Sequence, residues 1–303
     1  MRRVVQKQLP DGTIMYCQPF HISMEGMETA VLCRDDEDYD VMVKIICVSA
    51  KRKNVIVVIY AVVSNHCHVA VLAVTQEDAE AYGYELKRMY SMWFSRKYGE
   101  KGTMRGVDVK ALPLETDWHV RNSLAYIPRN ALDNGCNVNE YKWSGFRGMF
   151  GGDKGEGFYS VNSLSRRERE EIMHTGDNLR NVPWKLDQNW CIVPSSFCDS
   201  GYLEQAFERD QAYFMRVLGG MNPAEMKHVF VDAPRRMRTD GEVFKSVQDI
   251  SMRWYQIGIT DLSEERKIRL IVYVMRVMKT SIPQMSRVFG LSRDRIAKIL
   301  ADK

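Results

Sequence analysis

Two histidines in a Val- and Ile-rich segment carry the clearest chemical signal in this sequence. His66 and His68 flank Cys67. In a β-strand alternate side chains lie on one face, so the two imidazoles would stand side by side and could chelate one divalent metal ion. Two ordinary histidines on a half-exposed strand would have the same spacing. Cys67 points the other way, and we expect it to be a small buried residue rather than a ligand.

A tyrosine and an asparagine, four residues apart, would complete such a site. Tyr126 and Asn130 share one face of a predicted helix. Mg²⁺ and Mn²⁺ prefer oxygen ligands, and the amide of Asn130 would supply one. A phenol with a pKa of about 10 is a weak nucleophile, so attack by Tyr126 on phosphorus needs a metal ion that neutralises phosphate charge. The alternative is that Tyr126 packs as an aromatic on an amphipathic helix.

The first 150 residues mix strands and helices, which predicts an α+β domain. Residues 54–74 are rich in Val, Ile and Tyr and predict one long buried strand, or two strands that meet at Ser64-Asn65. Residues 14–24 predict an edge strand. Helices are expected over residues 35–48, after an acidic cap, and over residues 76–98, ended by Gly99.

The helix that carries Tyr126 is predicted over residues 117–132, with Asp117 as its N-cap. Pro128 should kink or interrupt this helix, because proline lacks the N–H that the helix needs. The glycine-rich stretch 148–157 suggests a boundary between a domain of residues 1–150 and an all-α domain of residues 151–303.

Helices are predicted in the second domain over residues 203–218 and 263–279, and its last segment has the pattern of a helix-turn-helix. Two short apolar stripes over residues 280–301 are separated by Gly290, and Ser292 can cap the second helix. That helix would expose three basic residues to DNA: Arg293, Arg295 and Lys298. A helical hairpin with a basic face is the alternative. If the segment binds DNA, deleting residues 280–303 should weaken DNA binding and leave the active site intact.

Composition indicates a folded protein of a reducing compartment. The 303 residues carry a formal charge of only +4, which is weak evidence for nucleic-acid binding. The seven cysteines are scattered and form no CxxC pair, which argues against a zinc ribbon and a disulfide framework. The N-terminus lacks the apolar stretch of a signal peptide, and the longest apolar run, residues 55–63, is too short to span a bilayer. We therefore expect a cytoplasmic protein without a membrane partner.

Five motifs in order give the first 150 residues a resemblance to a known family. They are Phe20-His21-Ile22-Ser23, Asp38-Tyr39, residues 60–69, Tyr126-Ile127-Pro128-Arg129-Asn130 and Tyr141-Lys142-Trp143-Ser144. The series resembles the single-tyrosine transposases of the HUH (His-hydrophobic-His) nuclease superfamily, particularly the REP-associated tyrosine transposases. Two departures concern positioning: Val63-Ser64 stand where the family usually has Met-Pro, and Ala131 follows Asn130 where it usually has proline.

The resemblance implies a ferredoxin-like α+β fold with a central antiparallel sheet. It also implies His66, His68 and Asn130 as ligands of Mg²⁺ or Mn²⁺ and Tyr126 as the nucleophile. The substrate would be single-stranded DNA near hairpins, and the product a 5′-phosphotyrosine with a free 3′ hydroxyl. The C-terminal helix-turn-helix, if it binds DNA, would hold duplex DNA beside the hairpin. Family members act as monomers or as homodimers. The rival functions are a non-catalytic DNA-binding regulator that keeps the fold and a metal-dependent hydrolase in which water attacks.

Overall fold

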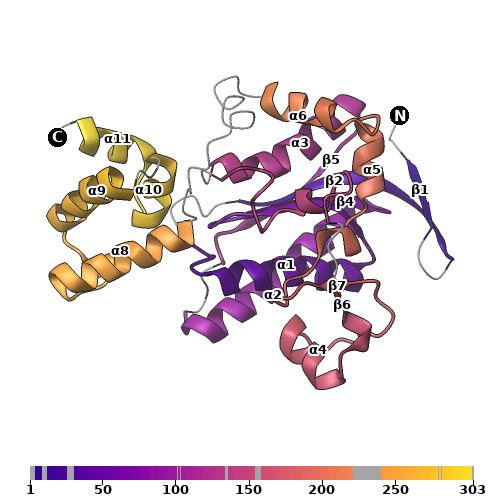
Figure 1. Ribbon diagram of the computed structural model, residues 1–303, viewed down its shortest axis with the longest axis horizontal. Coiled ribbons are helices and arrows are strands. Elements are labelled where there is room, and N and C mark those ends of the chain that lie inside the picture. Colours follow the sequence, from indigo (N-terminus) through magenta and orange to yellow (C-terminus); the bar gives the residue numbers. More distant parts are fainter. Residues whose placement is uncertain are drawn as a thin grey trace.

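An antiparallel sheet with helices, followed by a group of helices, makes up this mixed α+β protein (Figure 1). The computed structural model describes residues 4–8, 12–25, 31–100, 102, 104–133, 136–153, 158–220, 240–278, 280 and 282–301. Of the predicted linker 148–157, residues 154–157 therefore lie outside the described part.

The sheet is built around β2 (Ile14–Glu25). Strands β4 (Cys67–Ala73) and β5 (Asp108–Pro113) pair with its two sides, and β3 (Ile56–Val62) pairs with β4. The spatial order is β3-β4-β2-β5, and β1 (Val5–Gln8) pairs with the first residues of β2. Residues 54–74 thus form two strands that meet near Ser64-Asn65, which confirms the second alternative predicted from the sequence.

The prediction that β2 is an edge strand was wrong. This strand lies inside the sheet although Pro19, which has no N–H to donate, is part of it. Pro19 lies next to the end of the β2–β5 ladder, which reaches Phe20. Its carbonyl oxygen accepts from the amide of Leu114 at 2.9 Å, so the missing N–H removes at most one bond, at the end of this ladder.

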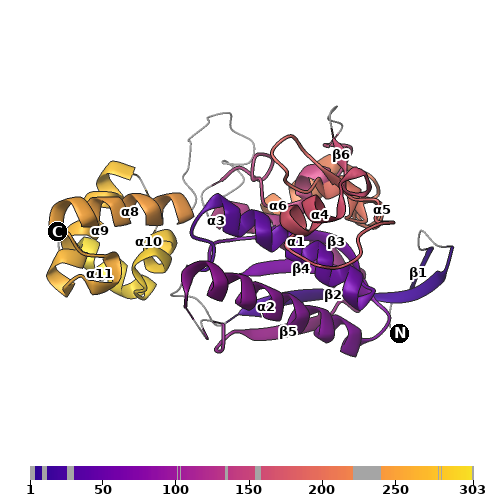
Figure 2. The ribbon, with the colours of Figure 1, turned by 90° about the horizontal axis from the view of Figure 1, so that it is seen from below.

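Two long helices cover one face of the sheet, α1 (Asp36–Lys53) and α2 (Gln76–Tyr98) (Figures 1 and 2). Asp35 caps α1 and α2 ends at Gly99, whose φ is 72°, as the sequence predicts. The predicted end of the first helix at residue 48 was wrong, because α1 continues to Lys53 and is capped by Asn54. The close approach of α2 requires a residue without a side chain, because a Cβ at Gly83 would lie 2.4 Å from the side chain of Val109.

The opposite face of the sheet carries α3 (Asp117–Asp133), which lies above the sheet in Figure 1. Its N-cap is Thr116, whose hydroxyl accepts a hydrogen bond from the amide of His119 at 3.1 Å. Asp117, predicted as the cap, lies instead in the first turn, where a carboxylate also suits the positive end of the helix dipole. Pro128 does not interrupt the helix, which continues to Asp133.

Short elements follow α3 and pack on the same hydrophobic core. They are η1 (Gly145–Gly148), β6 (Tyr159–Ser160), η2 (Val161–Ser163), α4 (Arg166–Met173), β7 (Lys185–Leu186), η3 (Pro194–Ser196), α5 (Ser200–Ala206) and α6 (Gln211–Gly220). The single helix predicted over residues 203–218 is two helices, because Glu208 and Arg209 adopt positive φ angles of 56° and 58° that end α5.

A separate hydrophobic core belongs to the C-terminal helices (Figure 2). They are α8 (Asp240–Tyr255), η4 (Ile259–Asp261), α9 (Glu264–Met278), α10 (Ile282–Phe289) and α11 (Arg293–Ala301). The first core extends from Met15 to Leu218, and the second begins at Val243. The buried side chains therefore do not divide at residue 150.

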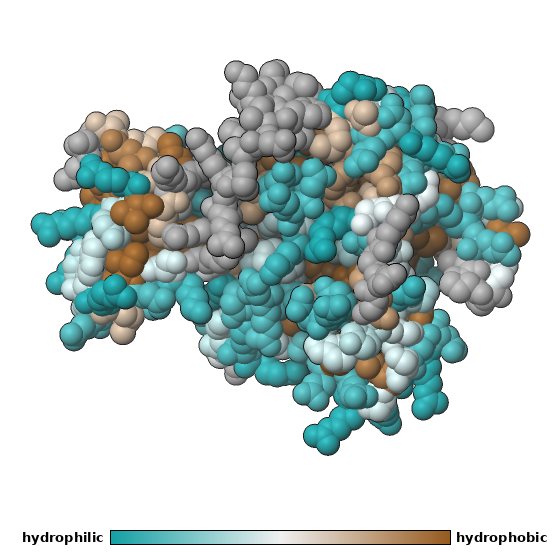
Figure 3. Space-filling model, viewed as in Figure 1, coloured by the Kyte–Doolittle hydropathy of each residue, from teal (hydrophilic) through white to brown (hydrophobic). Residues whose placement is uncertain are grey.

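The surface differs between the two parts. In the view of Figure 3 the sheet domain is mostly hydrophilic, whereas hydrophobic residues gather on the C-terminal helices. No helix in the described part of the chain is long and apolar enough to cross a membrane.

Candidate functional site

The two histidines and the tyrosine predicted to do chemistry lie together on the α3 face of the sheet. The ring of Tyr126, half-buried on α3, has its centroid 5.2 Å from that of His68 on β4. The ring centroids of His66 and His68 are 4.8 Å apart. Three rings from two elements more than fifty residues apart in sequence thus form one cluster.

A third histidine belongs to this cluster. In the sheet, Ser23 of β2 lies opposite His68, and opposite residues in an antiparallel pair share a face. His21, two residues from Ser23, is therefore on the same face. Its Nε2 lies 3.0 Å from Nδ1 of His68, and its ring centroid is 6.0 Å from that of Tyr126.

Sequence reasoning gave His21 no role, although the alternation of β2 contains a usable signal. Phe20 and Ile22 are buried at 2% and 1% exposure, while His21 between them is half-buried on the other face. What the sequence does not contain is the register that sets β2 against β4. That register decides which histidine on the neighbouring strand His21 meets.

The environment of His68 keeps its imidazole neutral. The ring is only 5% exposed, and burial, with His66 and His21 close by, lowers its pKa well below the usual value. A metal ligand must be a neutral imidazole, so this shift favours ligation. Cys67 behaves as predicted: it is buried on the other face, and burial raises its pKa to about 12.

Hydrogen bonds at Nδ1 favour ligation through Nε2 on both predicted ligands. Nδ1 of His66 lies 2.7 Å from Oδ1 of Asn65, an acceptor, so this nitrogen carries the proton. Nδ1 of His68 faces Nε2 of His21, and a proton on His68 Nδ1 likewise leaves the lone pair on Nε2. Metal-ligating histidines commonly donate their second N–H in this way.

The third predicted ligand, Asn130, lies one helical turn after Tyr126 and is 3% exposed. Its amide nitrogen donates to the carbonyl oxygens of Tyr126 and Ile127 at 3.0 and 3.1 Å, which orients the amide. The atom of this side chain that could ligate a metal ion is the amide oxygen. Imidazole and amide oxygen fit Mg²⁺ or Mn²⁺ in type. Within the described residues no group of three or more His, Cys, Asp or Glu is arranged as a metal site, and the predicted set has only two residues of these types.

Comparison of the chain with protein-family models, curated proteins and solved structures finds no match.

The three basic residues predicted to contact DNA are on the C-terminal helix α11, and all are exposed. Ser292 caps this helix as predicted, since its hydroxyl accepts from the amide of Arg295 at 3.2 Å. Arg293 and Lys298 form no ion pair among those identified in the described residues, whereas the guanidinium of Arg295 is bound to the carboxylate of Glu264 on α9. Arg295 is therefore partly neutralised.

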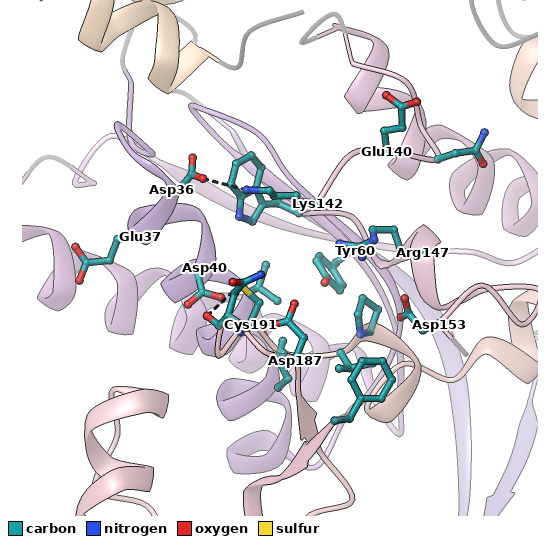
Figure 4. Close-up of a pocket in the computed structure, with 18 residues that line it drawn as sticks. Asp36, Glu37, Asp40, Tyr60, Glu140, Lys142, Arg147, Asp153, Asp187 and Cys191 are labelled. Atoms are coloured by element: carbon teal, nitrogen blue, oxygen red, sulfur yellow. Dashed lines mark hydrogen bonds and ion pairs between the residues drawn. The ribbon is translucent and has the colours of Figure 1, made fainter. Parts of the chain in front are cut away.

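A cavity of about 890 Å³ among the described residues lies elsewhere (Figure 4). It includes Tyr60, which lies opposite Val69 in the sheet and so points to the face away from His68. Lys142 pairs with Asp36 at the rim, and the cavity has one further cation, Arg147, against six carboxylates. The carboxylates are Asp36, Glu37, Asp40, Glu140, Asp153 and Asp187. This excess of negative charge disfavours DNA phosphates, so the histidine cluster is the better candidate site.

Proposed function

We propose that this protein cleaves and rejoins single-stranded DNA near hairpins, with Tyr126 as the nucleophile. Mg²⁺ or Mn²⁺ would be held by His66, His68 and Asn130. The observation that carries the proposal is the cluster of rings: Tyr126 lies 5.2 Å from His68, which lies 4.8 Å from His66. Beside this tyrosine, the Nδ1 atoms of both imidazoles are in hydrogen bonds, which favours metal ligation through their Nε2 atoms. Packing of the tyrosine alone would not require this arrangement.

The topology supports the same proposal. The order β2-α1-β3-β4-α2-β5 with antiparallel strands is the β-α-β-β-α-β order of ferredoxin-like domains, the fold expected from the family resemblance. The segment Tyr141-Lys142-Trp143-Ser144, part of that resemblance, binds along the edge of β3. There the Tyr141 hydroxyl donates to the Val62 carbonyl at 2.7 Å.

The reaction is a transesterification. The phenolic oxygen of Tyr126 forms a bond to phosphorus, the bond from phosphorus to the 3′ oxygen breaks, and the phenolic proton ends on that oxygen as a free 3′ hydroxyl. A metal ion held here would neutralise charge at the phosphate. His66 and His68 would hold it as neutral ligands, and Asn130 would be its ligand from the helix that carries the nucleophile. Because the phosphodiester energy is kept in the phosphotyrosine, attack by a 3′ hydroxyl rejoins the strand.

The helix pair α10–α11 would hold duplex DNA beside the hairpin, as a helix-turn-helix does. The two helices are joined by residues 290–292, with Gly290 at a φ of 65°. Exposed Arg293 and Lys298 on the first turns of α11 support this role. The protein would act as one copy or as a homodimer, and the test below distinguishes the two.

The test is incubation of the full chain with labelled single-stranded hairpins from the DNA that flanks the gene, with Mg²⁺ or Mn²⁺, on a denaturing gel. We expect a protein-linked band that disappears in Tyr126→Phe and with a chelator. The matched control is Tyr84→Phe, which removes a phenol from a side chain 57% exposed on α2.

Each other outcome identifies a rival. Cleavage without a linked band, unaffected by Tyr126→Phe, would favour the metal-dependent hydrolase. Binding to hairpins with neither band would favour the non-catalytic regulator. Size-exclusion chromatography of the linked complex would distinguish one copy from a homodimer.

A further inference from the structure

Ser64, in the turn that leads into His66, is held by two sets of hydrogen bonds. Its carbonyl oxygen accepts from the amides of Leu32 and Cys33 at 2.7 and 2.8 Å. Its side chain is fully buried, and its hydroxyl donates to Oδ2 of Asp240. Asp240 is the first residue of α8, so this hydroxyl joins the His-x-His strand to the C-terminal helices.

Asp240 is in turn paired with a buried cation. Nε of Arg287 donates to Oδ2 of Asp240, and Nη2 to Oδ1 at 3.3 Å. Asp240 is fully buried and Arg287 on α10 is 8% exposed, so each charge is compensated by the other within the protein. The carboxylate therefore connects two groups: the turn before His66 and the first helix of the α10–α11 pair.

The start of α8 fits closely against the segment that holds Ser64. A Cβ at Gly241 would lie 2.8 Å from the carbonyl oxygen of Arg34, so only glycine allows this approach. The guanidinium of Arg34 lies 6.0 Å from the centroid of Phe244. Thus α8 packs against residues next to Leu32 and Cys33.

We propose that Asp240 is a positioning residue for the His66–His68 pair. Through Asp240, the C-terminal helices would hold in place the turn at Ser64 that leads into His66. The geometry also gives a reason for one departure from the family pattern. A proline at position 64 has no hydroxyl to donate, whereas Ser64 can bind the carboxylate that α8 brings. Substitution of a group that orients a metal ligand, without itself binding the metal, commonly lowers metal affinity or activity about 10- to 100-fold. The catalytic consequence rests on the function proposed above; the structural link does not.

The variant that tests the link is Ser64→Ala, because it removes one donor and leaves the buried ion pair intact. Asp240→Asn would leave the Arg287 guanidinium without a counter-charge and disturb folding. The matched control is Ser49→Ala, a fully buried serine of α1 whose hydroxyl binds Met89 Sδ at 3.5 Å.

The first measurement is amide hydrogen exchange of the full chain without DNA. In Ser64→Ala we expect the amides of Leu32 and Cys33 to exchange about tenfold faster than in the wild type, because their acceptor is less firmly held. In Ser49→Ala we expect no change at these amides. Unchanged exchange in Ser64→Ala would overturn the link.

The second measurement is the rate of phosphotyrosine formation. We expect kcat to fall about 10- to 100-fold in Ser64→Ala with KM for the hairpin unchanged, since the substitution alters no residue proposed to bind DNA. An unchanged kcat would overturn the positioning role. Faster exchange in the variant with no adduct from the wild type would support the structural link and refute the tyrosine chemistry, so the two failures are distinguishable.

Discussion

At the scale of single residues, His21 belongs to the site although no role was predicted for it from the sequence. The pairing of β2 with β4 brings it next to His68. Its Nε2 is the only partner identified for Nδ1 of His68 in the described residues, at 3.0 Å. If His68 ligates through Nε2, His21 must accept its proton, and this fixes both the tautomer and the ring orientation. His21 then acts on the metal through His68.

This role predicts a difference between two substitutions of His21. In His21→Phe the acceptor is removed, and we expect Mn²⁺ affinity, measured by isothermal titration calorimetry, to fall about 10- to 100-fold. In His21→Gln an amide oxygen can still accept from His68, and we expect most of the affinity to remain. His119→Gln, at an exposed histidine of α3, is the control. Equal affinities of the Phe and Gln variants would show that the hydrogen bond plays no part.

At the scale of elements, the features that the sequence predicts are those set by residues close together in the chain. The β3–β4 hairpin, the start of α1 and the end of α2 follow from β-branched composition, the cap Asp35 and Gly99, all of which are signals within a few residues. The interior position of β2 does not, because it depends on the pairing of β4 and β5 with its two sides. Likewise, the apolar stripe over residues 203–218 continues across two helices, and only the left-handed Glu208 and Arg209 separate them.

The same limit applies to the site. The spacing of His66 and His68 and of Tyr126 and Asn130 is visible in the sequence, because both members of each pair lie on one element. Contacts between elements, such as Ser64 with Asp240, depend on tertiary packing, and no local pattern indicates them.

A cluster of ion pairs that links α1 and α2 should respond to pH. Arg52 of α1 binds Glu85 of α2 and Asp177, at 2.6 Å each. Hydrogen bonds from Arg88 and Arg52 lower the pKa of Glu85 to about 2. A carboxylate with a depressed pKa stabilises the fold above its unfolded pKa, and this contribution is lost as pH falls from about 4.5 toward 2.

Glu85→Gln should therefore lower the thermal stability at pH 7 and have a smaller effect at pH 3. Because Arg52 and Arg88 are partly solvated, we expect about 1 kcal/mol or less at pH 7. Thermal unfolding followed by circular dichroism at pH 7, 4.5 and 3 measures the difference, with Glu80→Gln on the same helix as the control. A difference between Glu85→Gln and wild type that grows as pH falls would contradict the assignment.

At the scale of the whole molecule, the C-terminal helices are built into the rest of the protein by the Asp240 link. The expectation that deletion of residues 280–303 leaves the active site intact therefore needs revision. The deletion removes Arg287 and leaves the buried carboxylate of Asp240 without its cation, at a cost of about 3–5 kcal/mol. Loss of activity in that truncation would not identify a DNA-binding role, so the role must be tested by changes at exposed residues only.

Exposed charges on α11 provide that test. Arg293→Gln with Lys298→Gln should weaken binding to duplex DNA and reduce the slope of log K against log salt by about 1 for each phosphate that is no longer neutralised. Glu264→Gln should act in the opposite direction, because it removes the carboxylate that neutralises Arg295. Fluorescence anisotropy over a range of salt concentrations measures both, with Arg166→Gln on exposed α4 as the control for net charge. Since none of these residues touches Asp240 or Arg287, the rate of phosphotyrosine formation on a short single-stranded hairpin should not change. If Glu264→Gln and the double variant bind DNA equally well, α10 and α11 are a helical hairpin with a basic surface, and their contribution is the support they give to the turn before His66.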